Sequence, residues 1–314
     1  MVSLAPNVTD ILYAVGAGSR VVGITNFTKL PQNSPKKPSV GDPLDPSIEK
    51  IVSLKPDLVF VSETINRLQT VESLGRLGIP VYSTNAQTVE GMLATIERVA
   101  ALVGVKPAGE KLAERLQARL GALHERLKGH KPKRVLFVAW RNPLITTGRD
   151  TFLADALRWA GARNVVQVRE HWPHVSLEEI VHLQPQELIF PGQGSGTAAE
   201  IRRALLHQPG WRELDAVRRG HLLVVSSAID RPSPALVSVI ERLAHELHPA
   251  AFADQKSPNA KAARGSGGTP RDKATRGLRS TQTGVSAPLA ARKDGSGRRG
   301  GNEISAAGAK PWRP

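Results

Sequence analysis

The sequence predicts an α/β protein with two similar Rossmann-like lobes, each built on a mostly parallel sheet and joined by one long backbone helix. The first observation is a motif, S-(I/L)-E-x-I-V-x-L-x-P, that begins at Ser47 and again at Ser176, 129 residues later. Each copy predicts a short helix that a serine caps and a proline ends, followed by a buried β-branched strand. Solenoid repeats reach only about 50 residues, so this spacing favours two duplicated lobes. A helix, a proline and a strand also occur together in unrelated α/β proteins, which is the alternative interpretation.

Length and composition are the second observation. A chain of 314 residues has room for two domains of about 150 residues. It contains no cysteine, which excludes disulfides, thiolate metal sites and cysteine nucleophiles. The net charge of +15 is uneven, because residues 254–314 carry 13 basic and 4 acidic side chains. The rest of the chain is only mildly basic, so no nucleic-acid partner is expected.

The start of the chain carries no targeting signal that we recognise. No run approaches the ~20 apolar residues of a membrane span. Met1 is followed directly by a predicted strand rather than by a signal peptide. A cytoplasmic protein is therefore expected if this start is genuine.

The first predicted lobe covers residues 1–86. A helix near residues 10–15 would be capped by Asn7 or Thr9, and residues 25–45, rich in Pro, Asn, Lys and Ser, form a long surface loop. Strands are expected at residues 1–4, 21–24, 58–61 and 79–82, and helices at 47–55 and 66–77.

A helical connector is predicted over residues 87–130. Thr88 caps a helix that runs to Val103, and a second helix opens at Pro107, a favoured first position. This helix carries an apolar stripe typical of a buried face: Leu112, Leu116, Leu120, Leu123 and Leu127. A coiled coil would show the same stripe but would need more length. A helix of ~20 residues is about 30 Å long, enough to link two lobes stiffly.

The second predicted lobe covers residues 131–252, and a basic tail covers residues 253–314. The tail is rich in Gly, Ser, Ala, Pro, Lys and Arg, a composition that predicts disorder. It has hardly any aromatic residues, so it does not resemble a nucleic-acid-binding segment. In the lobe, strands are expected at residues 134–140, 188–190 and 220–225, a turn at 142–143, and helices at 151–160, 176–184, 198–207 and 234–247.

The glycine-rich loop at residues 192–197 lies between a predicted strand and a predicted helix, where phosphate-binding loops occur. It lacks the Gly-Lys-Ser/Thr ending, and its third glycine falls at the wrong spacing for the dinucleotide fingerprint. Ser195 has glycines as direct neighbours, which excludes a nucleophile elbow. A flexible turn is favoured, and an enzyme that binds a nucleotide phosphate here is the alternative of another class.

Two histidine pairs, His171/His174 and His245/His248, have spacings that could bind a metal. Neither has an evident third ligand, so no metal site is expected. No Ser/His/Asp triad or carboxylate pair can be assembled, because the acidic residues fall on helix faces expected to be solvated.

The scarce aromatic residues are the third observation. Trp140 ends a predicted strand, Trp172 lies in a loop, and Phe27 follows the strand at residues 21–24, whereas Trp159 and Trp211 are expected in the core. In α/β proteins ligands bind beyond the carboxyl ends of strands. Flat apolar rings at such places favour a large planar ligand.

Residues 2 to about 249 resemble the substrate-binding proteins of ABC transporters of the cobalamin, haem and iron-siderophore type, with the cobalamin-binding branch most similar. The resemblance rests on residues 2–12 (VSLAPNVTDIL), 16–23 (GAGSRVVG), 54–59 (LKPDLV), 78–81 (GIPV), 172–178 (WPHVSLE) and 230–234 (DRPSP).

The resemblance implies a non-enzymatic periplasmic protein, expected to be monomeric and without a cofactor. It would bind a metal chelate between its lobes, a corrinoid or alternatively haem or a ferric siderophore, and pass it to an ABC permease with its ATPase subunits. By position, the implied ligand-binding residues are Pro6, Asn7, Asn26, Phe27, Ser62, Glu63, Trp140, Arg141 and Trp172. The family also carries one permease-docking acid on each lobe. Asp230 matches the C-terminal one, whereas the N-terminal position lacks an acid and has Glu63 and Glu72 as nearest substitutes.

Overall fold

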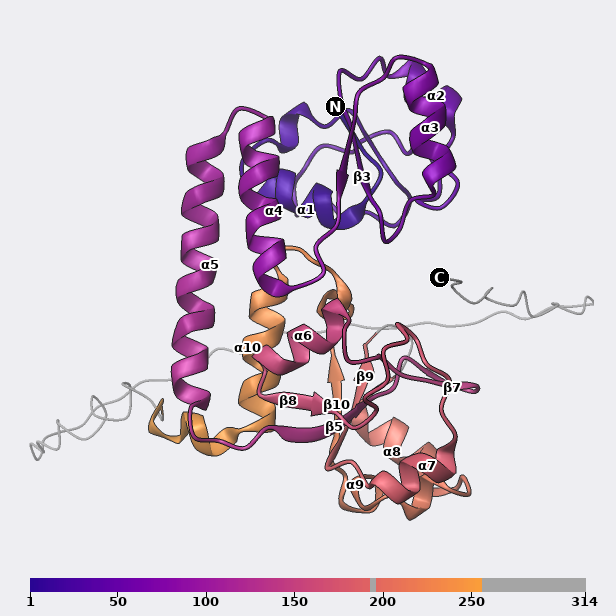
Figure 1. The fold of residues 1–314 in the computed structure, drawn as a ribbon, viewed down its shortest axis with the longest axis vertical. Helices are drawn as coiled ribbons and strands as arrows, with labels where there is room; N and C mark the ends of the chain where they lie inside the picture. The colour runs from indigo at the N-terminus through magenta and orange to yellow at the C-terminus, as the bar shows by residue number, and fades with distance from the viewer. Residues whose placement is uncertain (193–195, 256–314) are drawn as a thin grey trace, which may run out of the picture. The chain divides into compact units, whose positions relative to one another are not determined.

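The computed structural model describes residues 1–192 and 196–255 of the chain (Figure 1). The predicted basic tail therefore lies almost entirely outside the described residues, as does the middle of the glycine-rich loop. No helix in the described ranges is both long and apolar enough to cross a membrane.

The N-terminal lobe contains a four-stranded parallel sheet in the order β2-β1-β3-β4. Its strands are β1 (Val2–Ser3), β2 (Gly23–Ile24), β3 (Val59–Ser62) and β4 (Val81–Thr84). Its helices are α1 (Pro6–Ala14), the 3₁₀ turn η1 (Gly18–Arg20), α2 (Ile48–Ser53) and α3 (Leu68–Arg76). Side chains alternate across β3, as a strand buried on both faces requires. Phe60 packs in the cluster that contains Ile11 of α1, whereas Val61 packs in the cluster of α2 and α3 with Leu74.

The C-terminal lobe contains a second four-stranded parallel sheet in the order β10-β9-β5-β8, and a separate antiparallel hairpin, β6-β7. The strands are β5 (Lys133–Phe137), β6 (Trp140–Arg141), β7 (Leu144–Ile145), β8 (Ala162–Asn164), β9 (Glu187–Pro191) and β10 (Leu222–Val225). The helices are α6 (Phe152–Trp159), α7 (Leu177–Leu183), α8 (Ala198–Leu206), α9 (Asp215–Arg219) and α10 (Leu236–Leu247), with 3₁₀ turns η2 (Trp211–Glu213), η3 (Ser227–Asp230) and η4 (Pro249–Gln255).

The two large sheets have the same topology when the hairpin is set aside. If the strands of each sheet are numbered along the chain, both sheets have the order 2-1-3-4. In the C-terminal sheet these strands are β8, β5, β9 and β10. Both copies of the repeated motif form the helix before the third strand, α2 and α7. Ser47 Oγ accepts a hydrogen bond from the Lys50 amide at 3.2 Å, and Ser176 Oγ accepts one from the Glu179 amide at 3.0 Å. The repeat therefore occupies equivalent positions, as duplicated lobes would have.

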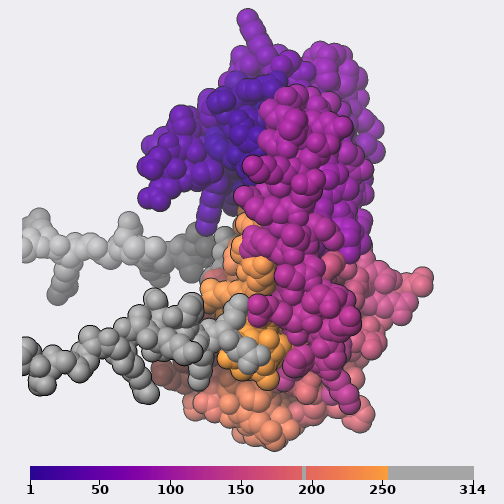
Figure 2. All heavy atoms as spheres, turned by 90° about the vertical axis from the view of Figure 1, so that its left-hand side faces the viewer, coloured from indigo at the N-terminus to yellow at the C-terminus, as the bar shows by residue number. Residues whose placement is uncertain are grey.

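Two long helices, α4 (Val89–Leu102) and α5 (Lys106–Leu127), connect the lobes and pack against each other. Figure 1 shows α5 running beside both lobes, and Figure 2 shows it along the face turned to the viewer. The predicted stripe is confirmed, because its first four leucines are buried: Leu112, Leu116, Leu120 and Leu123. They belong to one continuous core cluster that includes Ile11 of the N-terminal lobe and Leu243 of α10. Burial of apolar surface thus holds both lobes to the same pair of helices.

Several local predictions were wrong. Helix α1 begins at Pro6 with Ala5 as N-cap, so neither Asn7 nor Thr9 caps it; both are buried inside the helix. Proline at the first helical position explains the early start, because its missing N–H needs no partner there. Helix α3 begins at Leu68, two residues later than predicted, with Arg67 as N-cap.

In the C-terminal lobe Trp140 does not end the first sheet strand but belongs to the separate hairpin after it. The sequence analysis also missed β8 and α9. Strand β8 is a three-residue edge strand whose middle residue, Arg163, is exposed, so no apolar run marked it. Asp155 was expected on a solvated helix face but is buried.

Candidate ligand-binding site

The carboxyl ends of the strands are where this topology forms binding sites. In a sheet with the order 2-1-3-4, the connections after the first and third strands leave toward opposite faces, which opens a space between them. In the N-terminal lobe these segments follow β1 and β3, and in the C-terminal lobe they follow β5 and β9. Most of the predicted ligand-binding residues lie on or beside these segments.

The segment after β3 carries Ser62 and Glu63. Ser62 is buried, with its hydroxyl 2.9 Å from that of Thr64. Glu63 is exposed, and its carboxylate accepts a hydrogen bond from Asn85 Nδ2 at 2.7 Å. Asn85 follows β4, so the carboxyl ends of two neighbouring strands are joined by polar side chains at this edge.

The segment after β2 carries Asn26 and Phe27. Asn26 donates its amide proton to the Gly41 carbonyl at 2.9 Å, and its side-chain oxygen accepts a hydrogen bond from the Ser39 hydroxyl. Phe27 is 66% exposed. Leu68, at the start of α3 on the same edge, is 71% exposed, and the sequence analysis did not propose it. Both are large apolar side chains exposed to water at the carboxyl edge of the N-terminal sheet.

Pro6 and Asn7 differ from the other candidates because both are buried. The Asn7 side-chain oxygen has no hydrogen-bond partner among the described residues. These two residues shape the turn from β1 into α1 rather than offering exposed surface.

In the C-terminal lobe Trp140 lies on a small antiparallel hairpin, and Trp172 lies in the segment that pairs with its other strand. Trp140 pairs with Ile145, and Ile145 in turn pairs with His174. Residues directly opposite each other in antiparallel strands project to the same face, and so do residues two apart in one strand. Trp140, Ile145 and His174 therefore project to one face, and Trp172 lies outside any strand, two residues before His174. Trp140 is 52% exposed, and its indole N–H donates to the Asn142 carbonyl at 2.8 Å, whereas Trp172 is half-buried against the continuous core cluster.

Arg141 lies on the opposite face of this hairpin. It pairs with Leu144, which is buried in the core between the C-terminal sheet and helices α7 and α8. Arg141 itself is exposed. Trp140 and Arg141 thus do not project toward the same side of the hairpin.

Contacts between the lobes bring the carboxyl edges of the two sheets together. The Val89 amide at the start of α4 donates to Asp155 Oδ2 of α6 at 2.7 Å. Asp10 of α1 lies close to Arg231 and Ser233, which follow β10. Burial raises the pKa of the Asp10 carboxyl, and the Arg231 charge and Ser233 oppose this shift. The segments after β1 and β10 therefore meet at one junction.

The three candidate docking acids are all exposed. Glu63 lies at the end of β3, Glu72 lies within α3, and Asp230 ends η3 after β10. Although Asp230 as a residue is exposed, protein atoms surround its carboxyl; this desolvation raises the pKa of the carboxyl, and the charge of Arg231 opposes the shift. Glu63 and Asp230 thus both follow strand ends, one in each lobe.

The glycine-rich loop is unsuited to a phosphate at its helix end. Thr197 and Glu200 form a capping box at the start of α8, and the Thr197 amide donates to Glu200 Oε2 at 2.8 Å. The carboxylate of Glu200 therefore already occupies the positive end of this helix and would repel an anion. Gln193, Gly194 and Ser195 lie outside the described residues.

The histidine pairs have structural partners. His248 is buried, and its Nε2 lies 2.8 Å from the Gly161 carbonyl oxygen. The ring centroids of His245 and Phe252 lie 4.8 Å apart, and the backbone of His174 pairs with Ile145 of β7. Within residues 1–192 and 196–255, no group of three or more His, Asp or Glu side chains could hold a metal ion.

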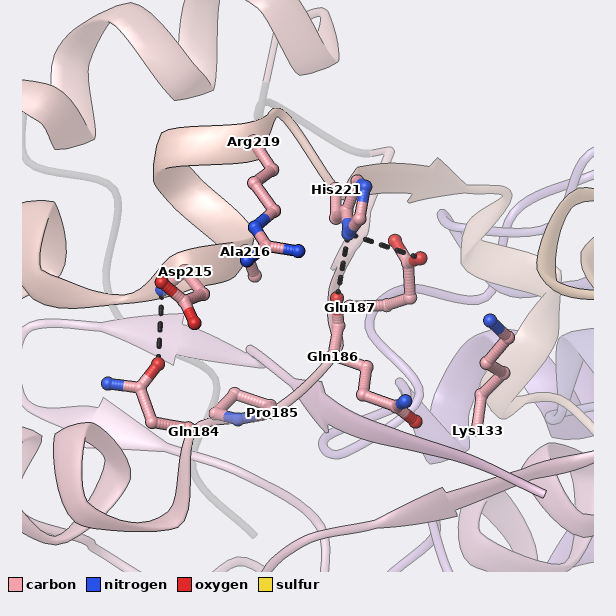
Figure 3. A pocket seen from close by; sticks show the side chains of 9 residues that line it. All are labelled: Lys133, Gln184, Pro185, Gln186, Glu187, Asp215, Ala216, Arg219 and His221. Carbon is pink, nitrogen blue, oxygen red and sulfur yellow. Dashed lines mark hydrogen bonds and ion pairs between the residues drawn. The ribbon is translucent and has the colours of Figure 1, made fainter. Parts of the chain in front are cut away.

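A polar cavity of about 190 Å³ lies at the opposite, amino end of the C-terminal sheet (Figure 3). Figure 3 shows His221 beside Glu187, with His221 Nδ1 3.8 Å from Glu187 Oε1. Another cavity, of about 220 Å³, lies between β10 and α10 and is lined by Val224, Val239 and Leu243 among others. No predicted ligand-binding residue lines either cavity.

Glu187 provides a test of the electrostatics in the first cavity. Burial raises the pKa of its carboxyl above the ordinary 4.5, and His221 and Lys133 only partly oppose the shift. Ionisation of Glu187 therefore disfavours folding, and its cost appears as pH rises from about 4.5 through the raised folded-state pKa. We expect Glu187→Gln to raise the free energy of unfolding at pH 7, with the gain vanishing below pH 4.5. Urea denaturation at several pH values measures this difference.

Glu200→Gln is the matched control with the opposite sign. Hydrogen bonds from Thr197 lower the pKa of the Glu200 carboxyl, so its ionised form favours folding. This substitution should lower stability at pH 7, and the loss should fade as pH falls through the depressed pKa. A stability change of the same sign in both variants would contradict the electrostatic assignment.

The comparisons with known proteins agree with this architecture. Residues 1–228 match a family model described as periplasmic binding protein. An ABC transporter substrate-binding lipoprotein of Bacillus subtilis is 30% identical over 260 residues, covering 80% of this chain and 81% of the relative. A vitamin B12-binding protein of Vibrio parahaemolyticus is 27% identical over 246 residues, covering 76% of this chain and 86% of the relative.

Solved structures with the same fold bind different chelates. The periplasmic vitamin B12-binding protein of Vibrio cholerae superposes with a TM-score of 0.69 at 25% identity, over 82% of this chain and 97% of the other. A periplasmic haem-binding protein of Pseudomonas aeruginosa superposes with a TM-score of 0.71 at 25% identity, over 79% of this chain and 92% of the other. The ligands in these names are a corrinoid and a porphyrin, both large planar metal chelates.

Proposed function

This chain belongs to the periplasmic binding protein family, and from that membership we propose that it captures a corrinoid between its lobes for an ABC importer. The observation that carries the proposal is the exposed indole of Trp140 beyond the carboxyl end of β5, on a hairpin whose other strand pairs with His174, two residues after Trp172. The exposed indole ring of Trp140 offers apolar area to a flat macrocycle, and an exposed phenylalanine on the other lobe, Phe27, offers more. Relatives named for vitamin B12 support this ligand.

The contacts divide by lobe. Phe27 and Trp140 provide exposed aromatic surface, and Asn26 and Glu63 provide polar groups at the N-terminal edge. Trp172 supports the C-terminal side from a half-buried position. Ser62, Pro6 and Asn7 act by shaping the backbone at the N-terminal edge, and Arg141 meets the ligand only at its periphery.

The proposed partners are an ABC permease and its ATPase subunits, and the proposed location is the periplasm. Asp230 would meet a permease arginine from the C-terminal lobe. Glu63 is the better N-terminal candidate than Glu72, because it follows a strand end in the same way as Asp230. The protein would act as a monomer without chemical catalysis.

Haem is the second candidate ligand, favoured by the haem-binding protein of the same fold. Titration with cyanocobalamin and, separately, with hemin under tryptophan fluorescence distinguishes the two. Quenching by cyanocobalamin at micromolar concentration supports the corrinoid, quenching by hemin alone supports the porphyrin, and quenching by neither overturns the proposed function.

Trp140→Ala is expected to weaken cyanocobalamin binding at least about tenfold, because a stacking aromatic contributes roughly 1.5 kcal/mol. Isothermal titration calorimetry measures the change. Leu77→Ala is the matched control. Leu77 is also exposed, but it follows the C-terminal end of α3 and precedes β4, away from the carboxyl ends of the strands. Equal losses in both variants would contradict the placement of the site.

A further inference from the structure

We infer that Asn66 is a positioning residue that fixes the N-terminal half of the binding surface before ligand arrives, and that Asn164 does so for the C-terminal half. The inference deepens the proposed function and rests on it for the nature of the ligand. The sequence analysis assigned no role to either residue. Both are more than nine-tenths buried.

Asn66 lies between β3 and α3 and uses both ends of its amide. Its Nδ2 donates to the carbonyl of Pro43 at 2.7 Å and to that of Leu4 at 3.2 Å. Its Oδ1 accepts a hydrogen bond from the Ser62 amide at 2.8 Å. One side chain therefore joins three segments that are distant in sequence.

Each of these segments leads to predicted ligand contacts. Leu4 precedes the turn that contains Pro6 and Asn7, and Ser62 precedes Glu63. Pro43 follows Gly41, whose carbonyl accepts the amide proton of Asn26. Four of the six N-terminal candidates thus lie within a few residues of a hydrogen bond that Asn66 makes. The other two, Asn26 and Phe27, lie at the hydrogen bond between the Asn26 amide and Gly41, two residues before Pro43.

The loop at residues 25–45 has the greatest need of such an anchor. It contains no helix or strand, and its backbone is paired by the isolated bridges Ile24 to Ser39 and Gly41 to Pro46 and by scattered hydrogen bonds such as that from Asn26 to Gly41. A long loop without regular structure has many conformations to lose on binding. An anchor that restricts them in the free protein leaves less entropy to be lost when the ligand binds.

Asn164 repeats the arrangement in the other lobe. Its Oδ1 accepts from the Phe137 amide at 3.0 Å, and its Nδ2 donates to the Thr147 carbonyl at 2.7 Å and the Thr146 hydroxyl at 3.1 Å. Phe137 ends β5, and Thr146 follows Ile145, the partner of Trp140. The hairpin with the exposed tryptophan is thereby tied to the sheet.

Asparagine suits this role because one small side chain carries two donor protons and an acceptor oxygen. Aspartate has the same shape but only acceptors. At residue 66 it would keep the hydrogen bond from Ser62 and turn a carboxylate oxygen toward two carbonyls. Asn66→Asp therefore releases the Leu4 and Pro43 segments selectively.

The test compares Asn66→Asp with Leu74→Ala at pH 7. Leu74 is fully buried in α3 and shares an apolar cluster with Val40 of the loop, but its truncation removes none of the hydrogen bonds of Asn66, so it destabilises the same lobe and keeps the anchor. Hydrogen exchange is measured at the amides of Asn26 and Leu44, and cyanocobalamin affinity by calorimetry. We expect Asn66→Asp to speed exchange at both amides about tenfold and weaken binding about tenfold, whereas Leu74→Ala leaves the exchange of the loop relative to α4 unchanged.

The inference is overturned if the loop exchanges in Asn66→Asp at the wild-type rate. It is also overturned if Leu74→Ala speeds loop exchange as much as Asn66→Asp does. Faster exchange with unchanged affinity overturns the link to binding. If the wild type binds no chelate, the proposed function fails while the exchange result still decides whether Asn66 holds the loop. Should Asn66→Asp not fold, Ser39→Ala at the exposed end of the same loop must show faster exchange at Asn26 and weaker binding.

Discussion

Replacing Gly148 by alanine is expected to lower the free energy of unfolding by about 3 kcal/mol and to displace the segment that carries Trp172. A Cβ atom at Gly148 would lie 1.8 Å from the carbonyl oxygen of Glu170 and 2.9 Å from that of Val168. Both are backbone atoms, so no side-chain rotation relieves the overlap. The two segments would have to move apart, and the hydrogen bond from the Gly148 amide to the His171 carbonyl, at 3.2 Å, would be lost.

Urea denaturation measures the loss of stability, and cyanocobalamin titration measures its effect on binding. Gly75→Ala is the control, because a Cβ atom there meets nothing within 4 Å and alanine favours the helix. We expect this control to be neutral or slightly stabilising, with unchanged affinity. A Gly148→Ala variant as stable as the wild type would contradict the close approach of residues 148 and 170.

The large-scale architecture could be predicted because its signals are local or repeated. The motif at Ser47 and Ser176 needs only adjacent residues to specify a capped helix and a strand, and both copies form as predicted. The stripe from Leu112 to Leu123 likewise follows from helical periodicity and is buried. Two such lobes and one such helix pair leave few alternative arrangements.

The details of the site could not be predicted because they depend on contacts between distant residues. Asn66 reaches Leu4 across 62 positions and Pro43 across 23, and nothing in its neighbourhood distinguishes it from a surface asparagine. Trp140 and Trp172 are 32 positions apart in sequence, and their segments meet only because β7 pairs with both Trp140 and His174. Asp155 was expected to be solvated, because its amide partner, Val89, lies 66 positions earlier in the sequence and no local pattern points to it.

The predicted contacts come from both lobes, so the relation between the lobes matters as much as either edge. A buried cluster runs without interruption from α1 through α4 and α5 to α10. Arg119 of α5 adds polar contacts to α10, donating to Glu241 Oε1 at 2.9 Å and to the Ser238 hydroxyl at 2.8 Å. Because the same helix pair supports both sheets, a change in the spacing of α4 and α5 should affect both halves of the site.

Alanine substitutions at two glycines of α5 should therefore have opposite effects. A Cβ atom at Gly109 would lie 2.3 Å from Ala100 Cβ and 3.3 Å from the Ile96 carbonyl oxygen, so alanine forces α4 and α5 apart. We expect Gly109→Ala to cost about 2 kcal/mol of stability, the usual cost of overpacking. At Gly121 nothing lies within 4 Å, and alanine should add about 0.5–1 kcal/mol through helix propensity.

Urea denaturation measures the difference in stability between the two variants. Both add one Cβ atom to the same helix, so the difference reports only what surrounds each glycine. Cyanocobalamin affinity should fall in Gly109→Ala and stay unchanged in Gly121→Ala, since only the first alters the spacing of the helices that support both sheets. Stabilisation in both variants would mean that α4 and α5 can move apart at no cost, despite the 2.3 Å distance between the added Cβ atom and Ala100 Cβ. A loss of affinity without a loss of stability in Gly109→Ala would instead show that binding depends on the helix spacing more steeply than folding does.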